Sequence, residues 1–299
     1  MNLINESHKL TTFIIRLNLV TTVYYPSLTE MHPGSIQRQI NTLFSEKIEL
    51  IGFYQHDASL EVMGPAPISQ DLHAASEIEL AHLLSLEKQN ERHAIVINFK
   101  NLTEQRVHLQ LHTLDFSNIC AMRTAGEKPA VLSASAILIC SASEELIVQQ
   151  RSGIVATHPH HWHIFGGAFN PIVDTISNQA SLRHTLHREI LEETSLSSAI
   201  PKNSTFSLCK ENTTGFLQWC LLGMPIDVAR LEHLHGNWEG SIHRLPFNQL
   251  AEFLQDEKWV PSGKANILSW LALGAPHTKP QQKFGPYTAL QLFERLIAK

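Results

Sequence analysis

Runs of apolar residues separated by polar turns predict alternating strands and helices in the second half of the chain. Residues 134–140 are a continuous run of small and apolar residues, which predicts a buried strand, and 145–150 are its expected hairpin partner. The pair Ile164 and Phe165 leads into two glycines. Further strands are predicted at 206–209, 216–222 and 242–245, and helices at 181–193, 247–255, 264–273 and 287–297.

The first 129 residues show a different pattern and predict a separate accessory α+β domain. The apolar run 13–23 is read as a strand, since it is too short to cross a bilayer and lacks the basic start of a signal peptide. Glycine and proline mark a break at 64–67. Helices are predicted at 35–46 and 74–87, and strands at 94–99 and 106–111. We expect this region to shape a substrate site or to dimerise.

Composition narrows the class of protein. A chain of 299 residues has room for two domains, and 43% hydrophobic with 17% charged residues describes an ordinary folded protein. A net charge of −5 gives no electrostatic case for nucleic-acid binding. The four cysteines have no C-x-x-C spacing, so we expect reduced core residues in a cytoplasmic protein without a membrane partner.

The most informative chemistry lies on the predicted helix 181–193. Arg188 is followed by Glu189, Glu192 and Glu193, and on a helix these carboxylates fall within an arc of roughly 100°. Such a face can bind hard divalent cations through oxygen ligands. For an isolated pattern of this kind, a solvated acidic helix face is the default alternative.

The sequence upstream favours a metal-binding helix over a solvated acidic face. The residues Trp162-His163-Ile164-Phe165-Gly166-Gly167 precede a polar loop that leads into the acidic helix. Together with Arg188-Glu189-Ile190-Leu191-Glu192-Glu193-Thr194-Ser195-Leu196, this segment resembles the Nudix hydrolases, whose box reads G-x5-E-x7-R-E-U-x-E-E-x-G-U, where U is aliphatic. The second half of the box matches.

The first half of the box departs from the family pattern. The family's first glutamate falls on Ala180, its first glycine on Asp174 and its late glycine on Ser195. The Gly-Gly pair comes seven residues too early, which indicates an insertion in the loop 168–178. Because that glutamate usually pairs with the box arginine, Asp174 or Asp227 is left as a substitute.

The resemblance implies a fold and a reaction. It implies an α/β fold, a Nudix-type α/β/α sandwich with a mixed sheet over residues 130–278, preceded by the smaller α+β domain 1–129 and followed by a C-terminal helix in 279–299. It also implies a pyrophosphohydrolase that uses Mg²⁺, with Mn²⁺ as a substitute. By resemblance, Glu189 and Glu193 bind the metal, Glu192 completes the shell directly or through water, and a carbonyl of the glycine pair, assigned to Gly166, is another ligand. Arg188 is structural.

Residues outside the acidic helix carry weaker expectations. Glu239 is an extra metal ligand or general base, or else an exposed loop carboxylate. Arg151 and Lys264 are candidates to neutralise phosphates, against the alternative of ordinary surface or capping charges. Trp162, with Gly167 beside it, is a candidate substrate contact, and Trp238 is a second candidate for stacking; aromatic residues so placed more often belong to the core.

Two further hypotheses stay open. The segments 210–214 and 260–267 are similar to the UDP-glucose pyrophosphatase branch of the family, which implies cleavage of a nucleotide sugar to UMP and a sugar 1-phosphate. The broken first half of the box instead favours a catalytically impaired module that binds a nucleotide or a protein. A homodimer is compatible with either. A zinc protein would rest only on the cluster His158, His160, His161 and His163.

Overall fold

The computed structural model describes residues 31–298 except 104, 156, 198 and 256–257. Met31–Lys299 forms one compact unit. The predicted strand 13–23 lies outside the described residues. Within the described ranges, no helix is long and apolar enough to cross a lipid bilayer.

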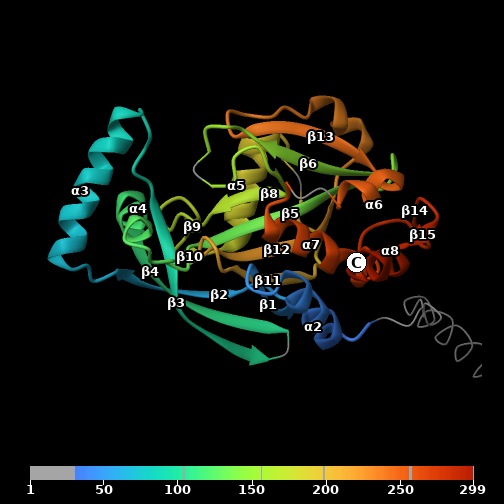
Figure 1. The fold of residues 1–299 in the computed structure, drawn as a ribbon, viewed down its shortest axis with the longest axis horizontal. Coiled ribbons are helices and arrows are strands. Elements are labelled where there is room, and N and C mark those ends of the chain that lie inside the picture. The colour runs from blue at the N-terminus through green and yellow to red at the C-terminus, as the bar shows by residue number, and fades with distance from the viewer. Residues whose placement is uncertain (1–30, 104, 156, 198, 256–257, 299) are drawn as a thin grey trace, which may run out of the picture. The chain divides into compact units, whose positions relative to one another are not determined.

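A mixed sheet forms the centre of the fold (Figure 1). Its central strands β5 and β12 are parallel, and the other strand pairs are antiparallel. Two short strands, β7 and β8, pair with β6 and β5. In sheet order the strands are β1 (Ile48–Tyr54), β11 (Phe206–Glu211), β12 (Leu217–Pro225), β5 (Leu132–Cys140), β6 (Glu145–Arg151) and β13 (Gly240–Pro246), with β7 (Trp162–His163) and β8 (Phe165–Ala168) beside them.

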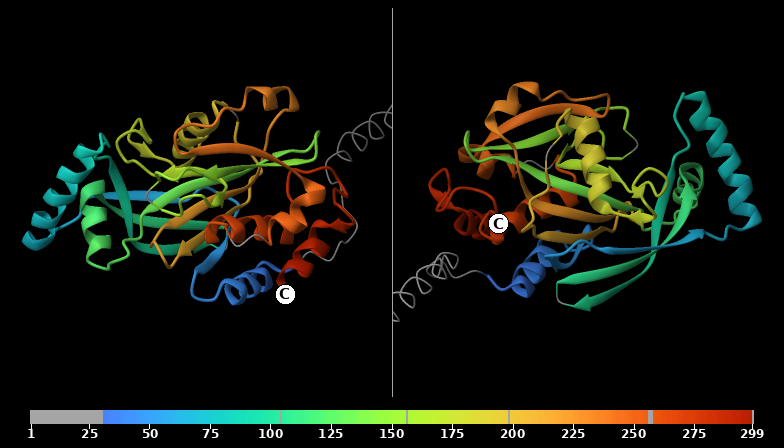
Figure 2. Two further views of the ribbon diagram at one scale, coloured as in Figure 1. Left: turned by 45° about the horizontal axis from the view of Figure 1, so that its top comes forward. Right: turned by 180° about the vertical axis from the view of Figure 1, so that it is seen from behind.

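Strand β5 is buried at every position because it lies between two apolar layers. Ile137 and Ile139 point into one core, and Ala136 and Leu138 point into the other, as the alternation of side chains along a strand requires. The first core is covered by α2 (Pro33–Phe44), α7 (Pro261–Ala272) and α8 (Ala289–Ile297), and the second by α5 (Leu182–Thr194), on the opposite face of the sheet (Figure 2). The predicted α/β/α sandwich with a mixed sheet is therefore confirmed.

The N-terminal region contributes to both layers of this architecture and to a second sheet. Strand β1 pairs with β11, with Ile48 opposite Glu211, and so belongs to the main sheet. Strands β2 (Ser59–Pro65), β4 (Arg106–Asp115) and β3 (Arg92–Thr103) form a separate three-stranded sheet, next to which α3 (Gln70–Ser85) and α4 (Phe116–Thr124) pack together (Figure 1). Residues 31–129 therefore contribute a strand to the main sheet and form a second sheet of their own.

Most predicted elements appear close to their expected positions, with a few differences. The expected helix 247–255 is two short pieces, η2 (Phe247–Gln249) and α6 (Leu250–Phe253). Strands β1 and β2 and helix α4 were not expected. The remaining elements are β9 (Thr175–Ile176), β10 (Gln179–Ala180), η1 (Val228–His233), β14 (Lys283–Phe284) and β15 (Tyr287–Thr288).

A buried polar network joins α7 to the sheet. The Asn266 side chain is fully buried; its Oδ1 accepts a hydrogen bond from Ser207 Oγ at 2.6 Å, and its Nδ2 donates to Gln218 Oε1 at 2.7 Å. Because all three groups are buried, each depends on the others for its hydrogen bonds.

Replacing Asn266 by alanine is expected to lower the free energy of unfolding by about 2–4 kcal/mol, since it leaves two buried polar partners unsatisfied and a small cavity. Asn98→Ala is the matched control, because the Asn98–Gln110 hydrogen bond is exposed. Urea denaturation of both variants measures the difference; equal losses would contradict this account of α7.

Candidate active site

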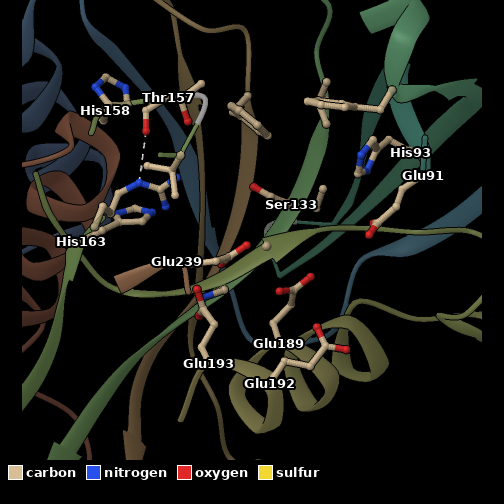
Figure 3. A pocket seen from close by; sticks show the side chains of 18 of the residues that line it. Glu91, His93, Ser133, Thr157, His158, His163, Glu189, Glu192, Glu193 and Glu239 are labelled. Atoms are coloured by element: carbon tan, nitrogen blue, oxygen red, sulfur yellow. Dashed lines mark hydrogen bonds between the residues drawn. The ribbon is translucent and has the colours of Figure 1, made fainter. Parts of the chain in front are cut away.

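A cavity of about 910 Å³ lies beside the C-terminal half of α5 and the glycine strand β8. Glu189, Glu192 and Glu193 project into it from α5, and Glu239 approaches from the loop before β13 (Figure 3). The cavity continues on both sides of these carboxylates. Figure 3 shows His158 and His163 at one side and His93 and Glu91 at the other, with Ser133 between them.

The sequence forms α5 where it does because both ends are defined. The Ser181 hydroxyl accepts a hydrogen bond from the Arg183 N–H at the N-cap, and Ser195 ends the helix in the left-handed conformation at φ 60°. Leu182, Leu186 and Ile190 face the core, so the acidic face is left toward the cavity. Ser195 occupies the family's glycine position, and the left-handed conformation explains why glycine is favoured there.

The glycine pair lets the backbone approach α5 closely. A Cβ atom on Gly167 would lie 2.3 Å from the Glu189 carboxyl carbon, and one on Gly166, at φ 141°, would lie 2.1 Å from the Ala134 carbonyl oxygen. The Gly166 N–H donates to Glu193 Oε2 at 2.7 Å. The strand therefore fixes the Glu193 carboxylate through a backbone N–H. A larger residue at Gly167 would displace the Glu189 carboxylate, and one at Gly166 would clash with the backbone of β5.

Arg188 holds the loop after β8 against the helix. Its Nε and Nη2 donate to the two carboxylate oxygens of Asp174 at 2.9 and 3.0 Å, and its Nη2 also donates to the Ala168 carbonyl oxygen at 3.1 Å. The Asp174 carboxylate is buried, with its side chain 1% exposed. Asp174 thus replaces the missing glutamate at Ala180, whereas Asp227 caps η1 through the Ala229 N–H.

The acidic face carries more negative charge than Arg188 neutralises. Nη1 of Arg188 lies 2.7 Å from Glu189 Oε1 and 3.3 Å from Glu192 Oε2. Burial raises the pKa of Glu189 to about 8; Arg188 opposes this shift, and Glu192 and Glu239 add to it. Burial also raises the pKa of Glu193 well above its usual range, with further contributions from Glu189 and Glu239.

This donor set fits a hard divalent cation. Carboxylates that are buried and repel one another are stabilised when a cation binds between them, and oxygen atoms are the ligands that Mg²⁺ prefers. Among the described residues, no group of three or more His, Cys, Asp or Glu side chains is already arranged around one metal position. The rings of His158 and His161 pack edge to face at 5.4 Å between centroids, but their ring nitrogens face separate partners, so the zinc hypothesis is not supported.

The histidines illustrate this separation. His158 lies 2.5 Å from Glu211 Oε1, and His161 Nδ1 lies 2.8 Å from the Pro159 carbonyl oxygen. His163 is buried, and burial together with Arg151 and His158 holds its pKa well below its usual range. From the sequence, no individual role was predicted for Glu211, although it lies in the segment 210–214 that carried the resemblance. The available signal was a charged residue at the end of an apolar strand.

The other candidate residues divide into two groups. Arg151, Gly166, Gly167, Trp238 and Glu239 line the cavity, as do the α5 residues. Trp238 is 61% exposed, so it is not a core residue.

The remaining two candidates require correction. Trp162 packs in the opposite core, with ring centroids 4.7 Å from Phe253 and 4.9 Å from His243, because its position in β7 points it away from the cavity. Lys264 lies on α7 and is not among the described residues that line the cavity. Neither is placed to contact a substrate there.

Comparison with known proteins finds structural neighbours only. No protein-family model matches the chain, and no curated protein matches it. Similar structures include a MutT protein from Methanosarcina mazei, with 18% identity over 47% of this chain and 91% of that chain at a TM-score of 0.35. A NUDIX hydrolase from Alicyclobacillus acidocaldarius has 13% identity over 49% and 92%, at 0.37.

A third neighbour was solved with a ligand. The NUDIX domain of Shewanella oneidensis NrtR, complexed with ADP ribose, has 16% identity over 45% of this chain and 82% of that chain, at a TM-score of 0.32. With TM-scores below 0.5, these likenesses do not establish the activity of this chain.

Asp174→Asn is expected to lower the free energy of unfolding by about 2–4 kcal/mol, because it leaves the Arg188 guanidinium half-buried without its bidentate partner. Glu145→Gln is the control, since Arg244, the partner of Glu145, is largely exposed and such pairs contribute at most about 1 kcal/mol. Chemical denaturation of the two variants would disprove the assigned role of Asp174 if their losses were equal.

The pKa of Glu189 predicts a pH-dependent stability. Since folding raises this pKa from 4.5 to about 8, its contribution to stability is present below the unfolded pKa and is lost as the pH rises through about 8. In EDTA, Glu189→Gln should match the wild type near pH 5 and exceed its free energy of unfolding by about 1–3 kcal/mol at pH 9. Excess Mg²⁺ should stabilise the wild type more than the variant; urea titrations at both pH values measure this.

Proposed function

We propose that this protein hydrolyses the diphosphate bond of a nucleoside diphosphate linked to another moiety, as a Nudix-type pyrophosphohydrolase. The observation that carries the proposal is the group of buried carboxylates at the middle of a cavity that continues on both sides of them. A substrate with a group on each side of its diphosphate suits such a cavity better than one that ends in a phosphate.

Mg²⁺ is the proposed cofactor, and Mn²⁺ the proposed substitute. Glu189 and Glu193 would hold it, with Glu192 acting directly or through water and the Gly166 carbonyl as a further ligand. When bound, the ion would neutralise negative charge on the diphosphate and lower the pKa of a bound water. The donor set supports this assignment, because Glu189 and Glu193 are buried with too little positive charge around them.

The protein's own groups would position the substrate and move protons. Glu239 is proposed to accept a proton from the attacking water, or else to add an oxygen ligand; its carboxylate lies close enough to Glu193 to share a hydrogen bond. The Arg151 guanidinium lines the same cavity and is available to neutralise a phosphate. Arg188 would keep α5 and the loop after β8 in register.

A nucleotide sugar, such as UDP-glucose, is the proposed substrate class, with UMP and a sugar 1-phosphate as products. Two observations support the preference. The segments that resemble the UDP-glucose pyrophosphatase branch supply Glu211 and Ser262 to the cavity wall, and the Ser262 hydroxyl donates to Glu211 Oε2 at 3.0 Å. We further propose a cytoplasmic protein that forms a homodimer and acts on a small-molecule nucleotide rather than on nucleic acid or membrane.

Glu193→Gln is expected to leave the fold intact and to lower turnover at least about 1,000-fold, because it removes a buried carboxylate proposed to bind the metal at the middle of the cavity. Product release should be measured with UDP-sugars, other nucleotide sugars and dinucleotides, in Mg²⁺, Mn²⁺ or EDTA. Glu294→Gln, an exposed substitution on α8, is the control.

Three outcomes of this assay separate the hypotheses. Metal-dependent cleavage of one substrate class by the wild type, lost in Glu193→Gln, supports the hydrolase. Wild-type rates in the variant would refute the assigned roles. Nucleotide binding without metal and without product would favour the alternative, a catalytically impaired binding module.

A further inference from the structure

One end of the cavity is built by the N-terminal region, and no function has been assigned to it above. Helix α4 supplies Arg123 and Phe116, and the start of β3 supplies His93, with Glu91 just before it. Phe216 from the β11–β12 turn lies opposite. Figure 3 places His93 and Glu91 at this end, beyond Ser133 and away from His158 and His163. This end therefore lies next to the carboxylates of α5 but is made by different elements.

Arg123 is held in place by packing rather than by an ion pair. Its guanidinium carbon lies 5.0 Å from the centre of the Phe216 ring, which covers one face of the group. Its Nε and Nη2 atoms are buried, and neither has a hydrogen-bond partner among the described residues. In the same described part of the chain, no carboxylate lies within ion-pair distance of Arg123.

This arrangement is unusual because a buried donor without a partner costs about 1–3 kcal/mol, and more for a charged group. The cost is visible in the direction of the pKa of Arg123, which burial lowers, although Glu211 acts in the opposite sense. The planar guanidinium needs oxygen atoms in its own plane, which is the geometry that a carboxylate or a phosphate provides.

His93 lies beside the Arg123 guanidinium and also has a buried nitrogen that lacks a hydrogen-bond partner among the described residues. Its ring packs edge-on against Phe116 at 5.4 Å between centroids, and its Nδ1 is buried without a partner among the described residues. Burial lowers the pKa of His93 to about 4, and the positive charges of Arg123 and Arg188 add to the shift. A neutral imidazole can donate one hydrogen bond to a ligand oxygen beside a guanidinium.

We propose that Arg123, with His93 beside it and Phe216 beneath it, forms a subsite that binds an oxyanion, a carboxylate or phosphate group, at the end of the cavity built by the N-terminal region. This proposal rests on the proposed function only where the oxyanion is part of a diphosphate substrate. In that case the subsite selects substrates that carry an additional acidic group over their neutral counterparts. The metal-binding carboxylates take no part in it.

A binding experiment tests the subsite without any reliance on catalysis. Inorganic phosphate is titrated by calorimetry into the wild type, Arg123→Gln and Arg38→Gln in EDTA. Gln keeps the stem of the side chain over Phe216 and removes the charge, and Arg38 is an exposed arginine on α2 that serves as the control. We expect phosphate affinity to fall at least tenfold in Arg123→Gln only. Equal affinities in all three proteins, each shown by its melting transition to be folded, would overturn the proposal.

A second measurement asks whether the subsite selects substrates. The pairs UDP-glucuronate with UDP-glucose, and NADP⁺ with NAD⁺, each differ by one oxyanion, so kcat/KM for each pair distinguishes a carboxylate from a phosphate. The wild type should favour one acidic member at least tenfold, and Arg123→Gln should lose that preference through KM. In Arg123→Lys, which keeps the charge but not the planar guanidinium, the preference for the acidic member should fall at least threefold.

The two measurements separate the failure of each proposal. If no compound in the panel is cleaved while phosphate binding still depends on Arg123, the hydrolase proposal fails and the subsite stands. If both members of each pair lose activity equally in Arg123→Gln, Arg123 does not discriminate between them and substrate selection by the subsite is refuted.

Discussion

The burial of negative charge on α5 is the constraint on which the rest of the site depends. Glu193 is 1% exposed and Glu189 is 9% exposed, so water solvates neither carboxylate well. Charges in such positions require compensation by cations or hydrogen bonds. The surrounding architecture supplies part of it: the Gly166 N–H faces Glu193, and Arg188 faces Glu189. The charge that remains uncompensated supports the proposal that a divalent cation binds here.

That constraint explains how neighbouring elements are arranged. At Gly166 and Gly167, strand β8 approaches α5 too closely for side chains, and the loop after β8 contacts Arg188. Asp174 completes this return, because its two oxygens face the guanidinium from the loop. The same arginine thus links the helix to the strand and to the loop, so a structural ion pair holds the carboxylates of α5 beside β8.

Sequence reasoning recovered the elements whose signals are local. The buried strand at β5, the helix at α5 and its acidic face all follow from periodicity or spacing. The partner of Arg188 did not follow from spacing. Ala180 stands where the family has the glutamate that pairs with this arginine, and only the fold brings Asp174, fourteen residues before the arginine, into contact with it. Trp162 was misplaced because a shift of one residue along a strand changes the face on which a side chain lies. Lys264 was misplaced because the face of α7 that meets the cavity depends on how that helix packs. Arg123 gave no signal, since its role depends on Phe216, which is distant in sequence.

The position of β1 has a consequence for how the chain can be divided. Ile48 pairs with Glu211 across more than half of the sequence, so this edge of the sheet closes only after both regions have been made. A shortened chain that began at residue 130 would carry every residue of the acidic helix and yet expose the backbone of β11 along an unpaired edge. Such edges recruit other strands, and this isolated C-terminal part would therefore be prone to aggregate.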